Sequence, residues 1–275
     1  MKCFAVCACL LCLTLLSAGC AAIGEGRPTS ELSQEVVVFA AASLTEAFTT
    51  VGASFEQSHP QSRVTFNFAG SQQLASQLDQ GAQADLFASA DQRQMEAAVS
   101  AGRIDPGAVV SFACNRLVVV ASGQSAASLH GLAQPGVKVV IGAEVVPVGA
   151  YTLNFLAAAA ADSSYGEAFR RGVLENVVSY EQNVRAVLSK VRLGEADAGI
   201  VYATDAQTAP DVIVLEIPAH LNQLAGYQIA PVRNGASSAL AQQFVDLLGS
   251  PAGVELLTDA GFSVDCPVAA GRRLP

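Results

Sequence analysis

The sequence predicts an α/β protein built from two lobes, each a mainly parallel sheet flanked by helices, with a ligand cleft between the lobes. First, short apolar, β-branched runs alternate with segments of helical period over residues 36–102, which indicates a parallel sheet with right-handed crossovers. Second, the same alternation restarts near residue 137. Third, 51% of the residues are hydrophobic and 14% are charged, which is ample for two cores and excludes a disordered chain.

The first strand–helix unit lies at Val36–Phe48, which reads VVVFAAASLTEAF. Val36–Phe39 is typical of a buried strand. The apolar residues that follow recur at helical spacing, which predicts a helix over 44–57. Ser43 stands at the junction with Glu46 three residues later, the signature of a capping box. A serine hydroxyl and unpaired backbone N–H groups at a helix N-terminus suit an anion, so this junction is the first candidate for function.

Further strand–helix units fill the rest of both lobes. Leu117–Ala121 and Tyr227–Val232 are apolar runs of similar length, and we expect the chain to cross between the lobes there. The last two helices would then return to the first lobe. The predicted strands are 63–68, 85–87, 117–121, 137–141, 177–179, 198–202 and 212–217, and the predicted helices start at Ser71 and Asp91 or cover 151–161, 165–174, 183–193, 238–248 and 251–260.

The crossing points set the expected domain boundaries. Residues 36–116 together with 230–265 form a discontinuous lobe 1, and residues 117–229 form lobe 2. Residues 266–275 show little pattern and are expected to be a loose C-terminal tail. A cleft between two such lobes, lined by the carboxyl ends of strands, is where these folds bind ligands.

The first 20 residues are predicted to be a signal peptide and not part of the fold. The apolar stretch after Lys2 is too short to span a bilayer as a helix. Leu16–Cys20 (LSAGC) resembles a bacterial lipobox, although Ser17 stands where leucine is usual, which leaves ordinary signal-peptidase cleavage open. We expect a lipidated Cys20, a flexible tether over 21–35, and an extracytoplasmic protein in the periplasm or on the cell surface, attached to the membrane through that lipid.

Of seven cysteines, Cys20, Cys114 and Cys266 would survive cleavage. With Cys20 lipidated, the other two form an even pair in an oxidising compartment, where a disulfide between them is one interpretation. Two unpaired buried thiols are the other. The sequence leaves both open.

Charge and motifs exclude several classes of function. A net charge of −9 without a basic run argues against nucleic acid, so a bound anion must be held by local donors. His59, His130 and His220 are far apart, with no spacing that suggests a cation site. The chain has no G-x-S-x-G elbow and no His beside a Ser or Cys nucleophile, so we expect no enzyme and no cofactor.

Uncharged hydrogen-bond donors stand at five turns where a strand ends or a helix begins. Hydroxyls and backbone N–H groups on converging helix N-termini would neutralise an anion, and hinge motion would close the lobes around it. A fully deprotonated oxyanion carries only acceptors, whereas hydrogen phosphate keeps a proton and needs an acceptor such as a carboxylate. The five turns contain no Asp or Glu. They are Ser43, Ser71, Pro147-Val148-Gly149, Asn183-Val184 and Tyr202.

Six segments resemble the molybdate-binding protein of bacterial ABC importers: FAAASLTEAF, FAGSQQLASQL, GAQADLFASADQRQM, VPVGAY, NVRAVLSKV and AGIVYATDA. The resemblance runs from about Val36 to Val264, with the motifs in family order. It implies the type II periplasmic-binding-protein fold and a monomer that delivers molybdate or tungstate to the membrane subunits of an ABC permease. The ligand would be held by two serines, two backbone N–H groups and one tyrosine hydroxyl, which fall on Ser43, Ser71, Val148, Val184 and Tyr202.

The chain departs from the family pattern at two places. Val148 stands where alanine is usual, and Gln72-Gln73 follows Ser71 where small hydroxyl residues are common. Three alternatives stay open. Another tetrahedral oxyanion, chiefly sulfate, would use the same donors; an enzyme would need a histidine near Ser43 or Ser71; and a surface interaction protein would not use the cleft at all.

Overall fold

The computed structural model describes residues 34–123, 126–266 and 272–273, the last two by their backbone alone. The predicted signal peptide, the lipidation site Cys20 and nearly all of the tether lie outside these ranges. The tether was expected to reach residue 35, but Gln34 and Glu35 already pair with β2 as the start of β1. In the ranges that are described, no helix combines the length and the apolar character of a membrane span.

The chain forms two separate sheets. The first has the strand order β11-β4-β10-β3-β1-β2, in which β1, β2 and β3 are parallel and β10 is antiparallel to both of its neighbours. We call this sheet with its helices the first lobe. Its strands are β1 (Gln34–Ala41), β2 (Ser62–Ala69), β3 (Leu86–Ser89), β4 (Val110–Asn115), β10 (Ala225–Pro231) and β11 (Arg272–Arg273).

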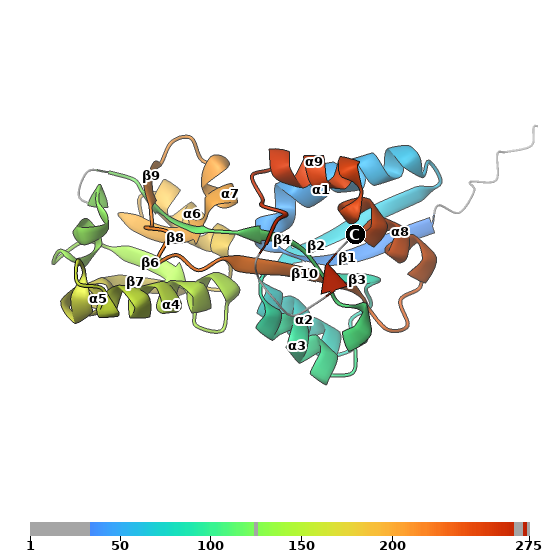
Figure 1. Cartoon of the computed structure of the whole chain (residues 1–275), viewed down its shortest axis with the longest axis horizontal. Coiled ribbons are helices and arrows are strands. Elements are labelled where there is room, and N and C mark those ends of the chain that lie inside the picture. The colour runs from blue at the N-terminus through green and yellow to red at the C-terminus, as the bar shows by residue number, and fades with distance from the viewer. Residues whose placement is uncertain (1–33, 124–125, 267–271, 274–275) are drawn as a thin grey trace, which may run out of the picture. The chain divides into compact units, whose positions relative to one another are not determined.

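Helices cover both faces of the first sheet (Figure 1). On one face lie α1 (Thr45–Ser58), α8 (Ser238–Gly249) and α9 (Pro251–Asp259), and on the other lie α2 (Ser71–Asp79) and α3 (Gln92–Ser100). The sheet is therefore buried on both sides, as a parallel sheet with crossover helices requires.

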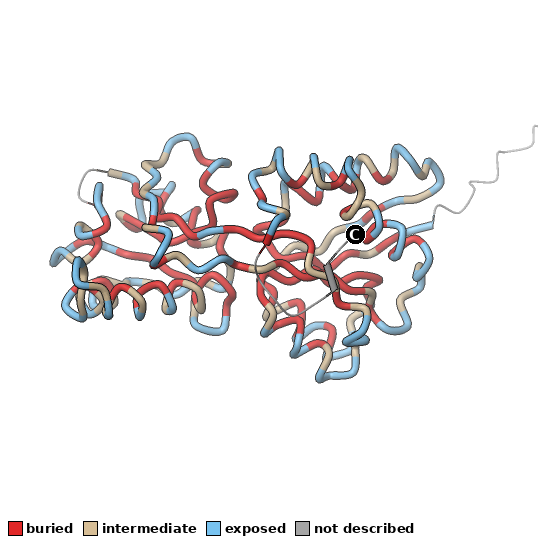
Figure 2. Tube along the Cα trace, viewed as in Figure 1, coloured by how far each residue is buried: buried red, intermediate tan, exposed pale blue. Residues whose placement is uncertain are grey.

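β1 shows why its residues make a central strand. Val36 and Val38 belong to the core cluster that contains Phe48 of α1, whereas Phe39 belongs to the cluster that contains Leu74 of α2. Successive side chains of a strand point to opposite faces, so a strand covered on both faces needs apolar residues at every position. The run VVVFAA supplies them, and the central strands are buried along most of their length (Figure 2).

The second sheet has the order β7-β6-β8-β5-β9 and, with its helices, is the second lobe. α4 and α5 cover one face, and α6 and α7 lie on the other (Figure 1). Its elements are β5 (Leu117–Ala121), β6 (Val139–Gly142), α4 (Pro147–Ala161), α5 (Gly166–Glu175), β7 (Val177–Glu181), α6 (Val184–Arg192), β8 (Ala198–Tyr202), α7 (Ala203–Gln207) and β9 (Ile213–Glu216).

The crossings between the lobes differ in part from expectation. β4, which was not predicted, ends at Asn115, and one residue, Arg116, separates it from β5 of the second sheet. The expected boundary at 229/230 falls inside β10, which pairs with the first sheet from Ala225 onward because its residues continue the ladder with β4. Residues 272–273, expected in a loose tail, pair with β4 as β11.

One local prediction is wrong. Ser43 does not cap α1, which begins at Thr45 after a 3₁₀ turn over Ala42–Leu44 and has no side-chain cap. The expected capping-box partner, Glu46, instead pairs with Arg185 of the second lobe. The extra 3₁₀ turn places Ser43 before the capping position, so its hydroxyl can bond to a group outside the helix.

The described cysteines are bonded. Cys114 of β4 and Cys266 form a disulfide, with Cα atoms 5.9 Å apart and a separation of 152 positions in sequence. Cys114 also exchanges backbone hydrogen bonds with Ser263. The segment after α9 is thus tied to the first sheet.

Candidate binding site

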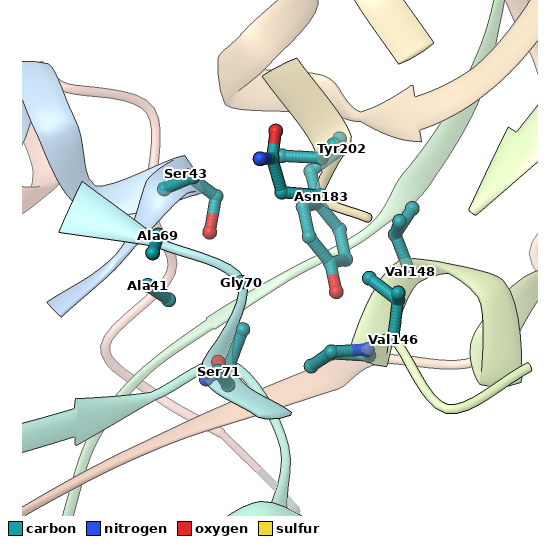
Figure 3. A pocket seen from close by; sticks show the side chains of 13 residues that line it. Ala41, Ser43, Ala69, Gly70, Ser71, Val146, Val148, Asn183 and Tyr202 are labelled. Atoms are coloured by element: carbon teal, nitrogen blue, oxygen red, sulfur yellow. Dashed lines mark hydrogen bonds between the residues drawn. The ribbon is translucent and has the colours of Figure 1, made fainter. Parts of the chain in front are cut away.

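All five turns selected from the sequence meet at one pocket between the lobes (Figure 3). The first lobe contributes the ends of β1 and β2 and the start of α2; the second contributes the starts of α4 and α6 and the end of β8. None of the described residues that line it is charged. They are Ala41, Ala42, Ser43, Ala69, Gly70, Ser71, Ala90, Val146, Pro147, Val148, Asn183, Val184 and Tyr202.

The pocket is small. Its cavity volume is about 10 Å³, whereas sites for drug-sized organic molecules span about 300–1,000 Å³. A compact ion suits this space better than an organic ligand.

Ser43 lies in the 3₁₀ turn that follows β1 and is 3% exposed. Its Oγ is 2.8 Å from the hydroxyl oxygen of Tyr227 in β10. The strand end thus places the serine at the pocket wall, and a buried tyrosine behind the wall holds its hydroxyl.

Ser71 is the first residue of α2, directly after Gly70, and is 1% exposed. Its Oγ accepts a hydrogen bond from the backbone N–H of Ala90, which follows β3, at 3.1 Å. Ser71 therefore does more than begin its helix, because the N–H that it binds belongs to another segment.

Two helices of the second lobe direct their N-termini toward the same pocket. Val148 stands in the first turn of α4, after Pro147, and Val184 is the first residue of α6. N–H groups in a first turn have no acceptor within their own helix. The Asn183 side chain accepts from Ala186 N–H at 2.9 Å, so this cap satisfies a later N–H and not that of Val184.

Gly149 allows α4 to start this close to β6. A Cβ at this position would lie 2.0 Å from the carbonyl oxygen of Ala143 and 2.4 Å from that of Gly142. Only a glycine permits this approach. The glycine therefore sets where the N–H of Val148 lies.

Tyr202 ends β8, and its ring enters the pocket from the second lobe (Figure 3). Its hydroxyl oxygen is buried and has no hydrogen-bond partner among the residues that the structure describes. Desolvation by burial raises the pKa of Tyr202 well above its ordinary value, and nearby tyrosines and aspartates add to this. At neutral pH the side chain is therefore a neutral hydroxyl that can donate one hydrogen bond.

A charged cluster lies behind the second-lobe wall. Arg185 of α6 approaches Asp205 of α7 with Nε 2.8 Å from Oδ1, an ion pair that lacks the alignment of a hydrogen bond, and also pairs with Glu46 of the first lobe. Burial raises the pKa of Asp205 to about 7; Arg185 opposes this rise and Glu46 adds to it. None of these three side chains lines the pocket.

The two glutamines after Ser71 connect the lobes. Gln72 Nε2 donates to the backbone oxygen of Gln182 at 2.7 Å, and Gln73 Nε2 contacts Gln182 Oε1 at the same distance. The sequence flagged these glutamines as a departure from the family pattern, but it gave no sign of their partner. It also missed Tyr227, which was read only as part of an apolar strand.

A cation site would need a cluster of metal ligands, and an enzyme of the kind considered above would need a histidine near Ser43 or Ser71. Among the described residues, no group of His, Cys, Asp or Glu could hold a metal ion. The histidines make contacts away from the pocket: His59 with Phe55 O, His130 with Ser164 O and His220 with Asp162.

Comparisons with known proteins agree with this architecture. Residues 36–263 match the family model described as bacterial extracellular solute-binding protein. The chain is 38% identical over 259 residues to the molybdate-binding protein ModA of Mycobacterium tuberculosis (strain ATCC 25618 / H37Rv), covering 90% of this chain and 94% of that protein. It is 32% identical over 262 residues to the molybdate-binding protein ModA of Escherichia coli (strain K12), covering 92% and 95%.

A solved structure supports the fold. The periplasmic molybdate-binding protein of Azotobacter vinelandii superposes with a TM-score of 0.72 at 21% identity, covering 84% of this chain and 100% of that one. At this identity the likeness speaks for the fold alone. The family model spans most of the chain, and relatives at 38% and 32% identity align with nearly all of it, so this chain belongs to the bacterial extracellular solute-binding proteins.

Proposed function

We propose that this chain is an extracytoplasmic receptor that binds molybdate or tungstate and delivers it to an ABC-type membrane permease. One observation carries the proposal: the buried hydroxyl of Tyr202, without a partner among the described residues, points into an uncharged pocket. The other walls of that pocket hold two serine hydroxyls and the starts of two helices. A tetrahedral oxyanion, which carries only acceptors, would satisfy these donors together.

The proposed contacts follow from this donor set. Ser43, Ser71 and Tyr202 donate through their hydroxyls, and Val148 and Val184 donate through their backbone N–H groups. Helix N-termini favour negative charge, so the site needs no cationic side chain. The absence of a carboxylate among the described lining residues disfavours hydrogen phosphate, which needs an acceptor.

Sulfate is the second candidate, because it is also a fully deprotonated tetrahedral anion. Relatives named molybdate-binding at 38% and 32% identity favour molybdate. The remaining parts of the proposal rest on the sequence. Cys20 would carry the lipid that attaches the receptor to the membrane, and the receptor would act as a monomer that performs no chemistry, uses no cofactor and binds no nucleic acid.

Calorimetric titration of the purified protein with molybdate, tungstate, sulfate and phosphate tests the proposal. The chain has no tryptophan, so heat is a better signal than fluorescence. We expect tight binding of molybdate and tungstate, with sulfate orders of magnitude weaker and phosphate weaker still. Equal affinities for sulfate and molybdate would overturn the substrate, and no heat with any of the four anions would overturn the binding function.

A further inference from the structure

Tyr227 lies behind the pocket wall and is fully buried. Its ring makes edge-on contacts with Phe112, Tyr202 and Phe262, with centroids 6.3, 6.0 and 5.2 Å away. Rings on several sides leave it one orientation, so its hydroxyl is held at 2.8 Å from Ser43 Oγ. Either oxygen can donate in such a pair, and the direction decides what Ser43 offers to the pocket.

Asn115, at the end of β4, is a second polar neighbour of the Tyr227 hydroxyl: burial raises the pKa of Tyr227, and the Asn115 amide opposes that rise. Its Oδ1 accepts from the backbone N–H of Arg116 at 2.9 Å. A backbone N–H can only donate, so this contact assigns the oxygen and the nitrogen of the amide. The Nδ2 group therefore points the other way, where it donates to Thr204 Oγ1 at 2.8 Å.

A phenol O–H is more acidic than an aliphatic O–H, so Tyr227 is the stronger hydrogen-bond donor of the pair. Ser43 Oγ is the acceptor that the described residues place within reach of it. Ser43 in turn accepts from Tyr227, so the serine proton is directed elsewhere. Since Ser43 lines the pocket, its O–H donates to whatever the pocket holds.

We infer that Tyr227 is a positioning residue that fixes the Ser43 hydroxyl as a donor and so makes the site favour fully deprotonated oxyanions over anions that keep a proton. The inference rests on the proposed function, because it concerns the same site. It goes beyond that proposal in assigning selectivity to a residue that does not touch the ligand.

Ser71 shows the same arrangement by an independent route. Its Oγ accepts from the N–H of Ala90 at 3.1 Å, and a backbone N–H has no alternative role. Both serines therefore have an acceptor site occupied from behind the wall. A hydroxyl that was free to rotate could also accept a hydrogen bond from hydrogen phosphate; a hydroxyl held in this way presents its own hydrogen.

The test compares sulfate with phosphate, two tetrahedral anions of similar size that differ in the retained proton. Competition of each against bound molybdate, followed by calorimetry, gives the ratio of their affinities. In the Tyr227→Phe variant we expect molybdate affinity to fall roughly two- to tenfold, as for one lost hydrogen bond. We also expect the ratio of sulfate to phosphate affinity to move toward phosphate.

A double-mutant cycle separates positioning from a general effect on the fold. If Tyr227 acts through Ser43, Tyr227→Phe changes molybdate affinity in the native background but not in the Ser43→Ala background. Tyr151→Phe is the matched control. Tyr151 is another largely buried tyrosine, whose hydroxyl accepts from Gly226 N–H at 3.4 Å, and its removal should leave the sulfate-to-phosphate ratio unchanged.

Two results would overturn the inference: equal losses from Tyr227→Phe in both backgrounds, or an unchanged sulfate-to-phosphate ratio. If Tyr227→Phe does not fold, Ser43→Ala alone gives the test: the ratio of sulfate to phosphate affinity should move toward phosphate, and an unchanged ratio would overturn the inference. Failure of the proposed function is distinct, because the native protein would then bind none of these anions.

Discussion

The polar groups in the two halves of the pocket differ in whether they already have hydrogen-bond partners within the protein. In the first lobe, both serine oxygens already take part in hydrogen bonds, Ser43 with Tyr227 and Ser71 with the N–H of Ala90. In the second lobe, the Tyr202 hydroxyl is buried without a partner among the described residues. The N–H groups of Val148 and Val184 stand in first turns, where their own helices offer no acceptor.

In the receptor proposed above, this difference assigns separate roles to the halves. The first half is oriented before a ligand arrives, so it sets which anion fits. The second half leaves a buried polar group unsatisfied, a state that costs about 1–3 kcal/mol per group. An anion bound between the lobes would remove that penalty. The second half would therefore supply free energy that favours closure of the lobes on the ligand.

A substitution that keeps the two halves of the pocket apart should have the largest effect on molybdate affinity. Gly70 has φ −61° and ψ 137°, which alanine adopts without strain, but an added Cβ would lie 2.4 Å from the backbone oxygen of Gln182 in the second lobe. We expect Gly70→Ala to reduce molybdate affinity about a hundredfold or more, beyond the loss of one hydrogen bond, in calorimetric titration. The melting temperature without ligand should not change.

Gly107→Ala is the control for this substitution, because the nearest atoms to its added Cβ are at 3.8 Å, on Asp105. Native affinity in Gly70→Ala would show that binding does not require the lobes to approach this closely.

Removing the unsatisfied donor comes next. Tyr202→Phe should weaken molybdate binding by about ten- to a hundredfold, the value of a hydrogen bond to a charged ligand, about 1.5–3 kcal/mol. The ligand-free variant should be no less stable to urea than the native protein, because the lost hydroxyl had no partner. Tyr180→Phe, at a side chain that is 58% exposed, should change neither quantity. Unchanged affinity in Tyr202→Phe would remove this residue from the site.

Ser71→Ala, the corresponding change in the first half, should lower the stability of the ligand-free protein, unlike Tyr202→Phe. Ser71→Ala removes a donor and also leaves the N–H of Ala90 without its acceptor. We expect weaker binding together with a loss of about 1–3 kcal/mol in the free energy of unfolding, measured by urea denaturation. Ser76→Ala, at an exposed position of the same helix, is the control. Equal stability of Ser71→Ala and Tyr202→Phe would contradict the claim that the two halves differ in their hydrogen bonding without ligand.

The smallest expected effect is a pH dependence confined to the second half. Burial raises the pKa of Asp205 to about 7, so this side chain gains negative charge as the pH rises from 6 to 8. Its charge acts on Tyr202, whose pKa it helps to raise. Anion affinity should therefore fall over this range by less than tenfold. Asp205→Asn should remove the dependence, and a persistent slope in that variant would assign it to another group.

The sequence predicted that the five turns would lie together, and they line one pocket because fold topology decides their positions. Ser43 and Ser71 follow the ends of β1 and β2, and Tyr202 is the last residue of β8; in α/β folds, ligands bind at the carboxyl ends of such strands. Recognising the strands was therefore enough to expect these residues to meet. The starts of α4 and α6 followed from the same alternation.

What the sequence missed depends on contacts that carry no periodic signal. β4 runs into β5 with one residue between them, so no turn marked its end, and the five residues of α7 are too few to show a helical period. Tyr227 occupies an apolar strand, and only the tertiary fold reveals that its hydroxyl meets Ser43. The contact of Gln72 with Gln182 joins residues 110 positions apart.

The disulfide has a consequence for an exported chain. Cys114 directly precedes the first crossing and Cys266 follows the last helix, 152 residues later, so the bond closes a covalent ring that contains the whole second lobe. A protease that cuts once inside the ring leaves a single molecule until a reductant is added. In a chain that emerges N-terminus first, Cys266 arrives after the entire second lobe, so this bond forms only once translocation of both lobes is complete.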